Sequence, residues 1–401
     1  MPSATKPPGR WVRFPTGYRA FVPDPLPPDL AWSPRLIRAL SDADRLIGRL
    51  AGEGGRLPNP HLLLRPFIKR EAVLSSRIEG TQATLGELLA AEAGAAVERS
   101  PDDLREVGNY VVALEHGIKR LQHLPLSLRL VRELHEKLMK GVRGERATPG
   151  EFRRLQNWIG APGCTLTDAS YVPPPPEELL ACLGAWEKFL HERALPPLAQ
   201  AALAHYQFEA IHPFLDGNGR VGRLLITLFL VERAILPTPL LYLSAFFEAT
   251  RRDYYDLLSG VTARGEWAAW LEYFLNGVAR QSEDALGRAE RINRLLERWR
   301  IAVGGAPAGG GTKREAGALA RPVRVPLLLV DLLAANPYVT VKKAAEQLGV
   351  AFSTAQRGID ALTRRGIIAQ VGKGRRHRVY CAKTILDILE EPARIVPAAP
   401  K

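Results

Sequence analysis

The sequence has few cysteines, no long hydrophobic run and a shortage of acidic residues. Its 401 residues include three cysteines, Cys164, Cys182 and Cys381, which are too few and too far apart for a disulfide framework or a spaced zinc site. The longest apolar stretches, such as 224–231, fall well short of the ~20 residues that cross a bilayer. The amino terminus lacks the charged and then apolar pattern of a secretory signal. We therefore expect a cytoplasmic protein with no membrane contact.

The charge that is present is mostly positive. There are 55 Lys and Arg against 42 Asp and Glu, which gives a formal net charge of +13. Residues 321–401 alone hold 14 basic and 6 acidic side chains. Such an excess suggests an anionic partner, either the phosphates of a nucleotide or a nucleic acid. The 46% apolar content is ordinary for a globular protein, and the length allows two or three domains.

Apolar residues recur at spacings of three and four, which predicts a mainly α-helical protein. Residues 1–34 contain nine prolines and are expected to form an extended arm that wraps or dangles. The first helix should begin at Arg35 and end at the glycines of 52–55, and the irregular stretch 141–176 should be a short hairpin or flap. Further helices are expected at 61–77, 84–96, 102–123, 127–140, 177–193, 196–211, 219–235, 246–264 and 266–302.

The carboxy-terminal part resembles a winged helix-turn-helix. Residues 303–320 are glycine-rich and predict a flexible linker. After it, residues 321–390 show the pattern of three short helices and two alternating strands. A basic wing at 373–378 suits phosphate contacts, but such domains also serve as dimer or protein-docking modules, so both functions stay open. The candidate recognition helix begins with Ser353, Thr354, Gln356, Arg357 and Asp360.

The most specific segment is 212–223, HPFLDGNGRVGR, a polar loop between two apolar helices. Gly217 and Gly219 allow the backbone to approach a ligand, and the free N–H groups at the start of the following helix favour an anion. Arg220 and Arg223 lie three residues apart, so both can point at that anion. The pattern therefore predicts a phosphate site.

Two further side chains of this segment suggest chemistry. Asp216 offers the oxygen ligand that Mg²⁺ takes beside nucleotide phosphates. His212 has an ordinary pKa near 6.5 and is a candidate general base. A plain surface turn with solvated arginines is the alternative, but complementary polar residues packed so closely between buried helices favour the phosphate site.

The segment 212–223 resembles the motif of the Fic family, HxFx(D/E)GNGRxxR, at every defining position. Similar segments occur in the family's order, and the likeness extends over roughly residues 20–300. It implies a Fic-type helical bundle with a short β-hairpin flap, followed by the small winged helix-turn-helix. The other similar segments are His135-Glu136, PGEFRRLQNWIG (149–160), TDASYVPPPPEEL (167–179) and PLLYLSAFFEATRRDYYDLL (239–258).

Most Fic proteins transfer AMP from ATP to a Ser, Thr or Tyr hydroxyl of a protein and release pyrophosphate. The resemblance makes His212 the base and Asp216 the Mg²⁺ ligand, with Phe214 as packing. A Doc-like kinase carries Lys where this chain has Gly219, so adenylyl transfer is favoured over phosphoryl transfer. The expected ligands of the ATP phosphates are Gly217, Asn218, Gly219, Arg220 and Arg223.

Two further assignments follow from the same resemblance. The flap would pair with a segment of the target protein by strand addition. Tyr254 and Tyr255 are candidates for contact with adenine, although a tyrosine pair on an amphipathic helix is more often core or rim. The flap residues are Thr167, Asp168, Ala169, Ser170, Tyr171 and Val172.

Residues 75–80, SSRIEG, match the inhibitory motif (S/T)xxxE(G/N) of Fic proteins. The resemblance implies that Glu79 pairs with Arg223 and prevents productive binding of ATP, so that the protein rests inhibited. Two alternatives remain. Glu79 could orient a water that removes AMP from a modified target, or the chain could be a DNA-binding regulator whose core senses nucleotide.

The sequence leaves the partners open. The target protein is not identified, and self-modification, a homodimer and DNA binding through 321–390 are all compatible with it. The expected division of the chain is an arm (1–34), a helical region with the inhibitory helix (35–125), the catalytic core and following helices (126–302), the linker (303–320), the winged helix-turn-helix (321–390) and a tail (391–401).

Overall fold

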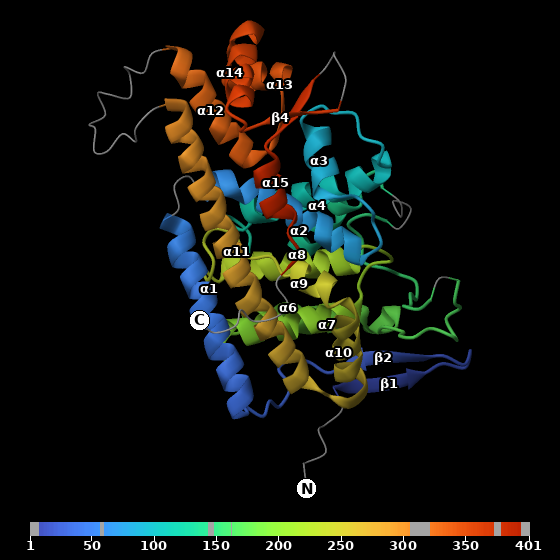
Figure 1. Cartoon of the computed structure of the whole chain (residues 1–401). Coiled ribbons are helices and arrows are strands. Elements are labelled where there is room, and N and C mark those ends of the chain that lie inside the picture. Colours follow the sequence, from blue (N-terminus) through green and yellow to red (C-terminus); the bar gives the residue numbers. More distant parts are fainter. Residues whose placement is uncertain are drawn as a thin grey trace.

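The computed structural model describes residues 8–56, 60–142, 148–161, 163–304, 321–372 and 378–393, and within them the chain is mainly helical (Figure 1). The strands are β1 (Gly9–Arg13), β2 (Arg19–Pro23), β3 (Tyr338–Thr340), β4 (Ala369–Val371) and β5 (Val379–Cys381). The helices are α1 (Pro34–Arg56), α2 (Pro60–Ile78), α3 (Leu85–Glu92), α4 (Pro101–Arg120), α5 (Leu128–Leu138), α6 (Pro176–His191), α7 (Pro197–Ile211), α8 (Asn218–Glu232), α9 (Ser244–Ala249), α10 (Arg251–Arg264), α11 (Trp267–Gly304), α12 (Arg321–Ala335), α13 (Val341–Leu348), α14 (Phe352–Arg364) and α15 (Lys383–Glu390).

Helices α7 and α8 form the centre of the molecule. Almost every side chain of both helices is buried, as expected of helices that are apolar on all sides. Helices α2, α4, α5, α6 and α11 pack around them, and α1 lies along the long helix α11 (Figure 1). The start of α8 is therefore held from several sides, which makes it a rigid platform for a site.

Short polar side chains fix where several surrounding helices begin. Thr84 accepts a hydrogen bond from the N–H of Glu87, whose own carboxylate accepts from the N–H of Thr84, which is a complete capping box. Ser100 and Ser127 cap α4 and α5 in the same way, by accepting from backbone N–H groups of the first turn. These caps place the helix starts within a few residues of the predicted positions.

The predicted single helix 246–264 is wrong, because the chain forms α9 and α10 with a break at Thr250. This residue has φ −118° and ψ 36°, outside the helical region. Its hydroxyl donates to the carbonyl of Phe246 at 2.7 Å and also lies 2.8 Å from the Tyr273 hydroxyl. Side-chain hydrogen bonds of this kind offer the backbone an alternative to the helix, and no Gly or Pro marks the position.

The first helix ends one residue beyond the predicted glycine cluster. Helix α1 continues through Gly52 and Gly54 to Arg56. A side-chain carbon at Gly54 would lie 2.9 Å from Cδ1 of Leu240, so this glycine allows close packing instead of stopping the helix. Tertiary contact outweighs the local cost of glycine here.

The proline-rich arm is partly regular. Strands β1 and β2 form an antiparallel hairpin in which Trp11 faces Phe21, and Pro23, at the end of β2, pairs with Gly9. The N–H of Phe21 donates to the carbonyl of Val172, and Gln207 of α7 donates to the carbonyl of Asp24. The arm thus wraps onto the body, which is one of the two arrangements expected, but its hairpin was not predicted.

The carboxy-terminal elements contain two features that the sequence did not predict, β3 and α15. The three carboxy-terminal strands form one antiparallel sheet in the order β3, β5, β4. Helices α12 and α15 pack on α2 and α11. Arg288 of α11 donates to the carbonyls of Ile388, Glu391 and Pro392. Most of the expected linker, residues 305–320, and the basic wing residues 373–377 lie outside the described residues, and so does most of the tail.

None of the helices within these ranges has both the length and the apolarity of a membrane-spanning segment.

Candidate active site

The loop between α7 and α8 is shaped by unusual backbone conformations. His212 adopts the left-handed region with φ 49° at the end of α7, and Gly217 has φ 76° directly before α8. The Asn218 side chain closes the loop, because its Oδ1 accepts from the N–H of Phe214 and its Nδ2 donates to the Phe214 carbonyl, both at 2.8 Å. Asn218, expected among the phosphate ligands, has both amide atoms committed to this internal role.

The carbonyl groups of the loop are held by residues that sequence reasoning did not single out. Buried Arg153 donates from Nε to the carbonyl of His212 at 2.9 Å, and its Nη2 reaches the carbonyl of Pro174 at 2.6 Å. Asn157 donates to the Phe214 carbonyl at 2.8 Å. Burial lowers the pKa of Arg153 to about 10, so it stays charged near neutral pH. Both residues lie in the segment 149–160, which only the family resemblance had marked.

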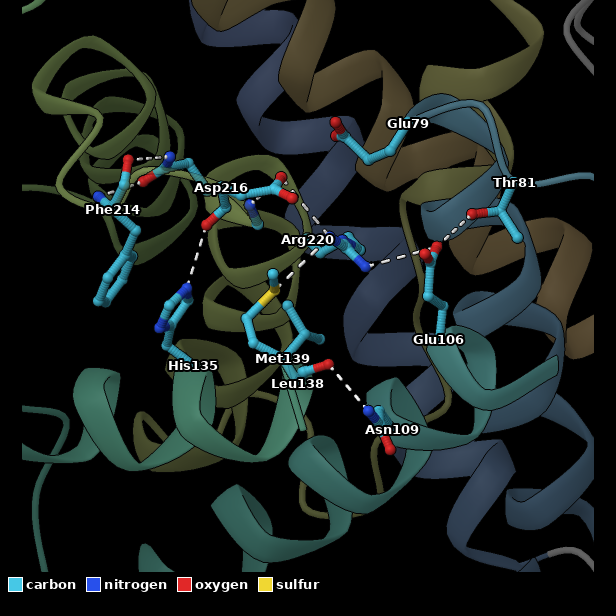
Figure 2. Close-up of polar contacts among 12 residues, drawn as sticks. Glu79, Thr81, Glu106, Asn109, His135, Leu138, Met139, Phe214, Asp216 and Arg220 are labelled. Atoms are coloured by element: carbon cyan, nitrogen blue, oxygen red, sulfur yellow. Dashed lines mark hydrogen bonds and ion pairs between the residues drawn. The ribbon is translucent and has the colours of Figure 1, made fainter. Parts of the chain in front are cut away.

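His135 of α5 contacts two residues of the loop between α7 and α8. Its ring stacks on Phe214 with the centroids 3.7 Å apart. Its Nδ1 accepts from the N–H of Gly150, so Nε2 carries the proton and donates to the carbonyl of Asp216 at 3.0 Å (Figure 2). Burial lowers the pKa of His135 to about 4, which keeps the ring neutral.

His212 has the protonation state of a base. Its Nδ1 lies 3.3 Å from the carbonyl of Glu209, and a carbonyl can only accept, so Nδ1 carries the proton and Nε2 keeps a lone pair. Burial is the main cause that lowers the pKa of His212 to about 4. The neutral ring can therefore accept a proton at physiological pH.

Arg223 belongs to the second turn of α8, and only 2% of its side chain is exposed. Its Nε donates to Ser75 Oγ at 3.0 Å, and its Nη2 donates to the Ser75 carbonyl at 3.0 Å and to Glu79 Oε1 at 2.6 Å. Burial acts to lower the pKa of Arg223, but Glu79 and other neighbours raise it on balance. The predicted contact between Glu79 and Arg223 is therefore present.

The carboxylate of Glu79 lies beside the first turn of α8. A side-chain carbon at Gly219 would collide with Oε1 of Glu79 and come within 2.8 Å of Nη1 of Arg223. Gly80, with φ 99°, makes the turn that follows α2. Burial acts to raise the pKa of Glu79, but Arg223 and then Arg220 lower it on balance, so the carboxylate is ionised. The ionised carboxylate of Glu79 therefore lies beside the first turn of α8 and pairs with Arg223.

Asp216 is the most accessible charged residue of the loop, with 51% of its side chain exposed. Its Oδ1 accepts from the N–H of Gly217 at 2.6 Å and lies 3.7 Å from Nη2 of Arg220. The described part of the chain has no group of three metal-ligating side chains. One carboxylate fits a Mg²⁺ that is held chiefly by nucleotide phosphates and water, and does not fit a metal held by protein alone.

The tyrosines predicted to contact adenine differ from each other in burial. Tyr254 is fully buried, and its hydroxyl lies 2.8 Å from Nε2 of His205, so it belongs to the core, while Tyr255 is exposed beside Arg251.

In the flap, the isolated bridge between Ile159 and Tyr171 replaces a longer hairpin. Thr167, Asp168 and Ser170 are exposed, Ala169 is half-buried, and Tyr171 and Val172 are tied to the body through Ala210 and Phe21.

Two segments of the chain match models of one protein family. Residues 37–119 match the Fic/DOC family N-terminal domain, and residues 125–230 match the Fic/DOC family domain. The protein adenylyltransferase Fic of Drosophila virilis is 34% identical over 166 residues, which are 40% of this chain and 32% of the relative. That of Drosophila yakuba is 32% identical over 166 residues, 40% of this chain and 31% of the relative. The chain spans about a third of the length of these curated relatives.

Solved structures confirm the mainly helical Fic fold. A Fic family protein from Desulfovibrio desulfuricans aligns with a TM-score of 0.56 and 19% identity, over 89% of this chain and 98% of that chain. A Fic domain containing signaling protein from Bacteroides thetaiotaomicron aligns with a TM-score of 0.50 and 23% identity, over 64% of this chain and 97% of that chain. At these identities the likeness concerns the fold alone.

Proposed function

We propose, from the premise that this chain belongs to the Fic/DOC family, that it is a protein adenylyltransferase inhibited by its own Glu79. The observation that carries the proposal is the convergence of a neutral His212 and two buried arginines, Arg220 and Arg223, on the start of α8. A base beside an anion site is the arrangement that transfer of a phosphate-containing group to a hydroxyl needs.

In the proposed reaction, Nε2 of His212 takes the proton from a Ser, Thr or Tyr hydroxyl of the target. The hydroxyl oxygen attacks the α-phosphorus of ATP, the bond from that phosphorus to the bridging oxygen of the β-phosphate breaks, and pyrophosphate leaves. The first N–H groups of α8, together with Arg220 and Arg223, hold the β- and γ-phosphates and stabilise the leaving charge. Asp216 would hold a Mg²⁺ ion, which when bound neutralises phosphate charge.

Inhibition follows from the contact between Glu79 and Arg223. The carboxylate uses the guanidinium that a terminal phosphate needs and adds a negative charge beside the phosphate site. Productive ATP binding therefore requires Glu79 to move away. Its side chain is 36% exposed, so it can leave toward solvent while Ser75 keeps Arg223 in place.

A second function uses the same residue. Glu79 lies near enough to His212 for each to shift the pKa of the other. A carboxylate in this place can orient a water for removal of AMP from a modified protein. The two directions differ in the effect of Glu79→Gly, which should raise transfer but abolish hydrolysis.

The test of the reaction type is label transfer in the Glu79→Gly chain with Mg²⁺ and either α-labelled or γ-labelled ATP. We expect protein to acquire the α-label and no γ-label, and we expect Glu79→Gly/His212→Ala to acquire neither. Incorporation of γ-label would show a kinase. Absence of both labels from Glu79→Gly, with loss of AMP from a modified protein in the unsubstituted chain, would favour the hydrolase.

A further inference from the structure

Arg220, the second arginine of the site, has a buried carboxylate beside it that belongs to another helix. Its Nη1 lies 3.7 Å from Oε2 of Glu106 on α4, and the exposed fractions of the two side chains are only 5% and 9% (Figure 2). On the other side, Nη2 of Arg220 lies 3.7 Å from Asp216 and 3.7 Å from the sulfur of Met139. Within the described residues, Nε and Nη1 of Arg220 have no hydrogen-bond partner. The guanidinium is thus enclosed by side chains but retains N–H groups that make no hydrogen bond among the described residues.

The same oxygen of Glu106 is bound by residues 75–81, which contain the inhibitory motif and are called the inhibitory segment below. Thr81, two residues after Glu79, donates from its hydroxyl to Oε2 of Glu106 at 2.8 Å (Figure 2). The oxygen that faces Arg220 therefore also accepts a hydrogen bond from the turn that follows α2. The inhibitory segment contacts Arg223 directly and Arg220 through one intervening carboxylate.

We propose that Glu106 is a positioning residue that holds the Arg220 guanidinium in place for the β- and γ-phosphates of ATP. This inference rests on the proposed function, because it takes the anion at the start of α8 to be the phosphates of a nucleotide. Glu106 itself touches no phosphate. It acts through Arg220, and its contact with Thr81 ties that arginine to the inhibitory segment.

Two opposing effects decide what removal of the Glu106 charge does. A negative charge near the site repels phosphate, so its loss would strengthen ATP binding. Its loss would also leave a buried guanidinium with the exposed Asp216 as its remaining ion pair among the described residues, and a buried charge without a close counter-charge is costly. Because Arg220 is almost fully buried, the second effect dominates, and the guanidinium moves away from the phosphate position.

The predicted consequence is selective for phosphates beyond the α-phosphate. AMP has no β- or γ-phosphate, so its binding does not depend on where Arg220 points. A general disturbance of α4 would weaken binding of AMP and ATP alike. The ratio of the two affinities therefore separates a positioning role from a merely structural one.

The experiment measures calorimetric binding of AMP, and of a non-hydrolysable ATP analogue with Mg²⁺, to the Glu79→Gly chain and to three double variants. Glu106→Gln removes the charge with little change of shape, and Glu106→Asp keeps the charge on a shorter side chain. Asp103→Asn is the matched control, since it makes the same carboxylate-to-amide change one turn earlier on α4, where the carboxylate lies near Arg99. Thermal unfolding of each variant is measured alongside.

We expect Glu106→Gln to weaken binding of the ATP analogue about tenfold, the loss that corresponds to one interaction with a charged group, and to leave AMP binding unchanged. Glu106→Asp should lose less, and Asp103→Asn should match the parent chain. Unchanged or tighter analogue binding in Glu106→Gln would overturn the inference, as would an equal loss for both nucleotides. Label transfer is measured separately. If the chain binds the analogue but transfers no label, the adenylyltransferase proposal fails. The role of Glu106 is then still tested by the ratio of the affinities for the ATP analogue and for AMP.

Discussion

The carboxylate of Glu79 accepts a 2.6 Å hydrogen bond from Nη2 of Arg223, although 144 positions separate the two residues in the chain. Ser75, one helical turn before Glu79, accepts from the same guanidinium through its hydroxyl and its carbonyl, both at 3.0 Å. The end of α2 and the residue after it therefore hold Arg223 with three hydrogen bonds, of which only one comes from the carboxylate of Glu79. We therefore expect Ser75 to keep Arg223 anchored when Glu79 alone is released.

Glu79→Ala should destabilise the protein only modestly. Two of the three bonds to Arg223 remain and Glu79 is partly exposed, so we expect a loss of about 1 to 2 kcal/mol in the free energy of unfolding. Because the pKa of Glu79 lies below 4.5 in the folded protein, this contribution is complete above about pH 4.5 and shrinks as pH falls through the lowered pKa. Urea unfolding at pH 7 and pH 3.5 measures it. A difference that grows at low pH would contradict the ion pair.

The rate of transfer should depend on the neutral form of His212. Burial places the pKa of this residue at about 4, so the base is already unprotonated at pH 6. In the Glu79→Gly chain, which also lacks the carboxylate that raises this pKa, the rate of the chemical step should be flat from pH 8 to pH 6 and fall only toward pH 4. Single-turnover labelling across this range measures the profile. A midpoint near 6.5 would indicate an unperturbed histidine and rule out the buried base.

Thr81→Val should release the inhibited state in part. The hydroxyl of Thr81 binds Glu106 and so helps to keep the segment after α2 closed. Loss of one such bond, worth about 1 kcal/mol, predicts a rise of about fivefold at most in basal labelling. Thr384→Val, the same change at an exposed position of α15, is the control and should have no effect. If Thr81→Val raises labelling equally in the Glu79→Gly chain, its effect is not on inhibition.

Arg153 should be the most sensitive position outside the motif. Its buried guanidinium donates to the carbonyls of Leu155, Pro174, Ile211 and His212. Arg153→Met would leave several buried acceptors unsatisfied, so we expect a loss of at least about 2 kcal/mol in unfolding free energy. Arg154→Ala, at an exposed position with one weak ion pair, should change stability by less than about 0.5 kcal/mol. Denaturant titration of both variants decides, and equal stabilities would refute the assigned role of Arg153.

The sequence was most informative where local pattern and function coincide. The loop 212–223 could be predicted because its glycines and charged residues lie between two helices that are apolar on all sides. Most helix limits could be predicted as well, since caps such as Ser100 and Ser127 are visible in the sequence. The contact between Glu79 and Arg223 could be expected only through the family resemblance, because nothing local links residues so far apart.

The parts that could not be predicted depend on tertiary contacts. Glu106 is an ordinary helical glutamate in the sequence, and only the packing of α4 against α8 brings it to Arg220. The break at Thr250 likewise depends on the Tyr273 hydroxyl, which comes from another helix. Strand β3 has three residues and pairs with β5 about forty positions later, which leaves no local periodicity to detect.

The central claim is that Glu79 inhibits adenylyl transfer by holding Arg223. The most direct measurement is the initial rate at which α-label from ATP enters protein, compared among the unsubstituted chain, Glu79→Gly and Glu79→Gly/Arg223→Ala under identical conditions. The account predicts that Glu79→Gly labels at least about tenfold faster than the unsubstituted chain, and that loss of Arg223 removes this gain. Equal rates in the unsubstituted chain and Glu79→Gly, or a gain that survives Arg223→Ala, would contradict it.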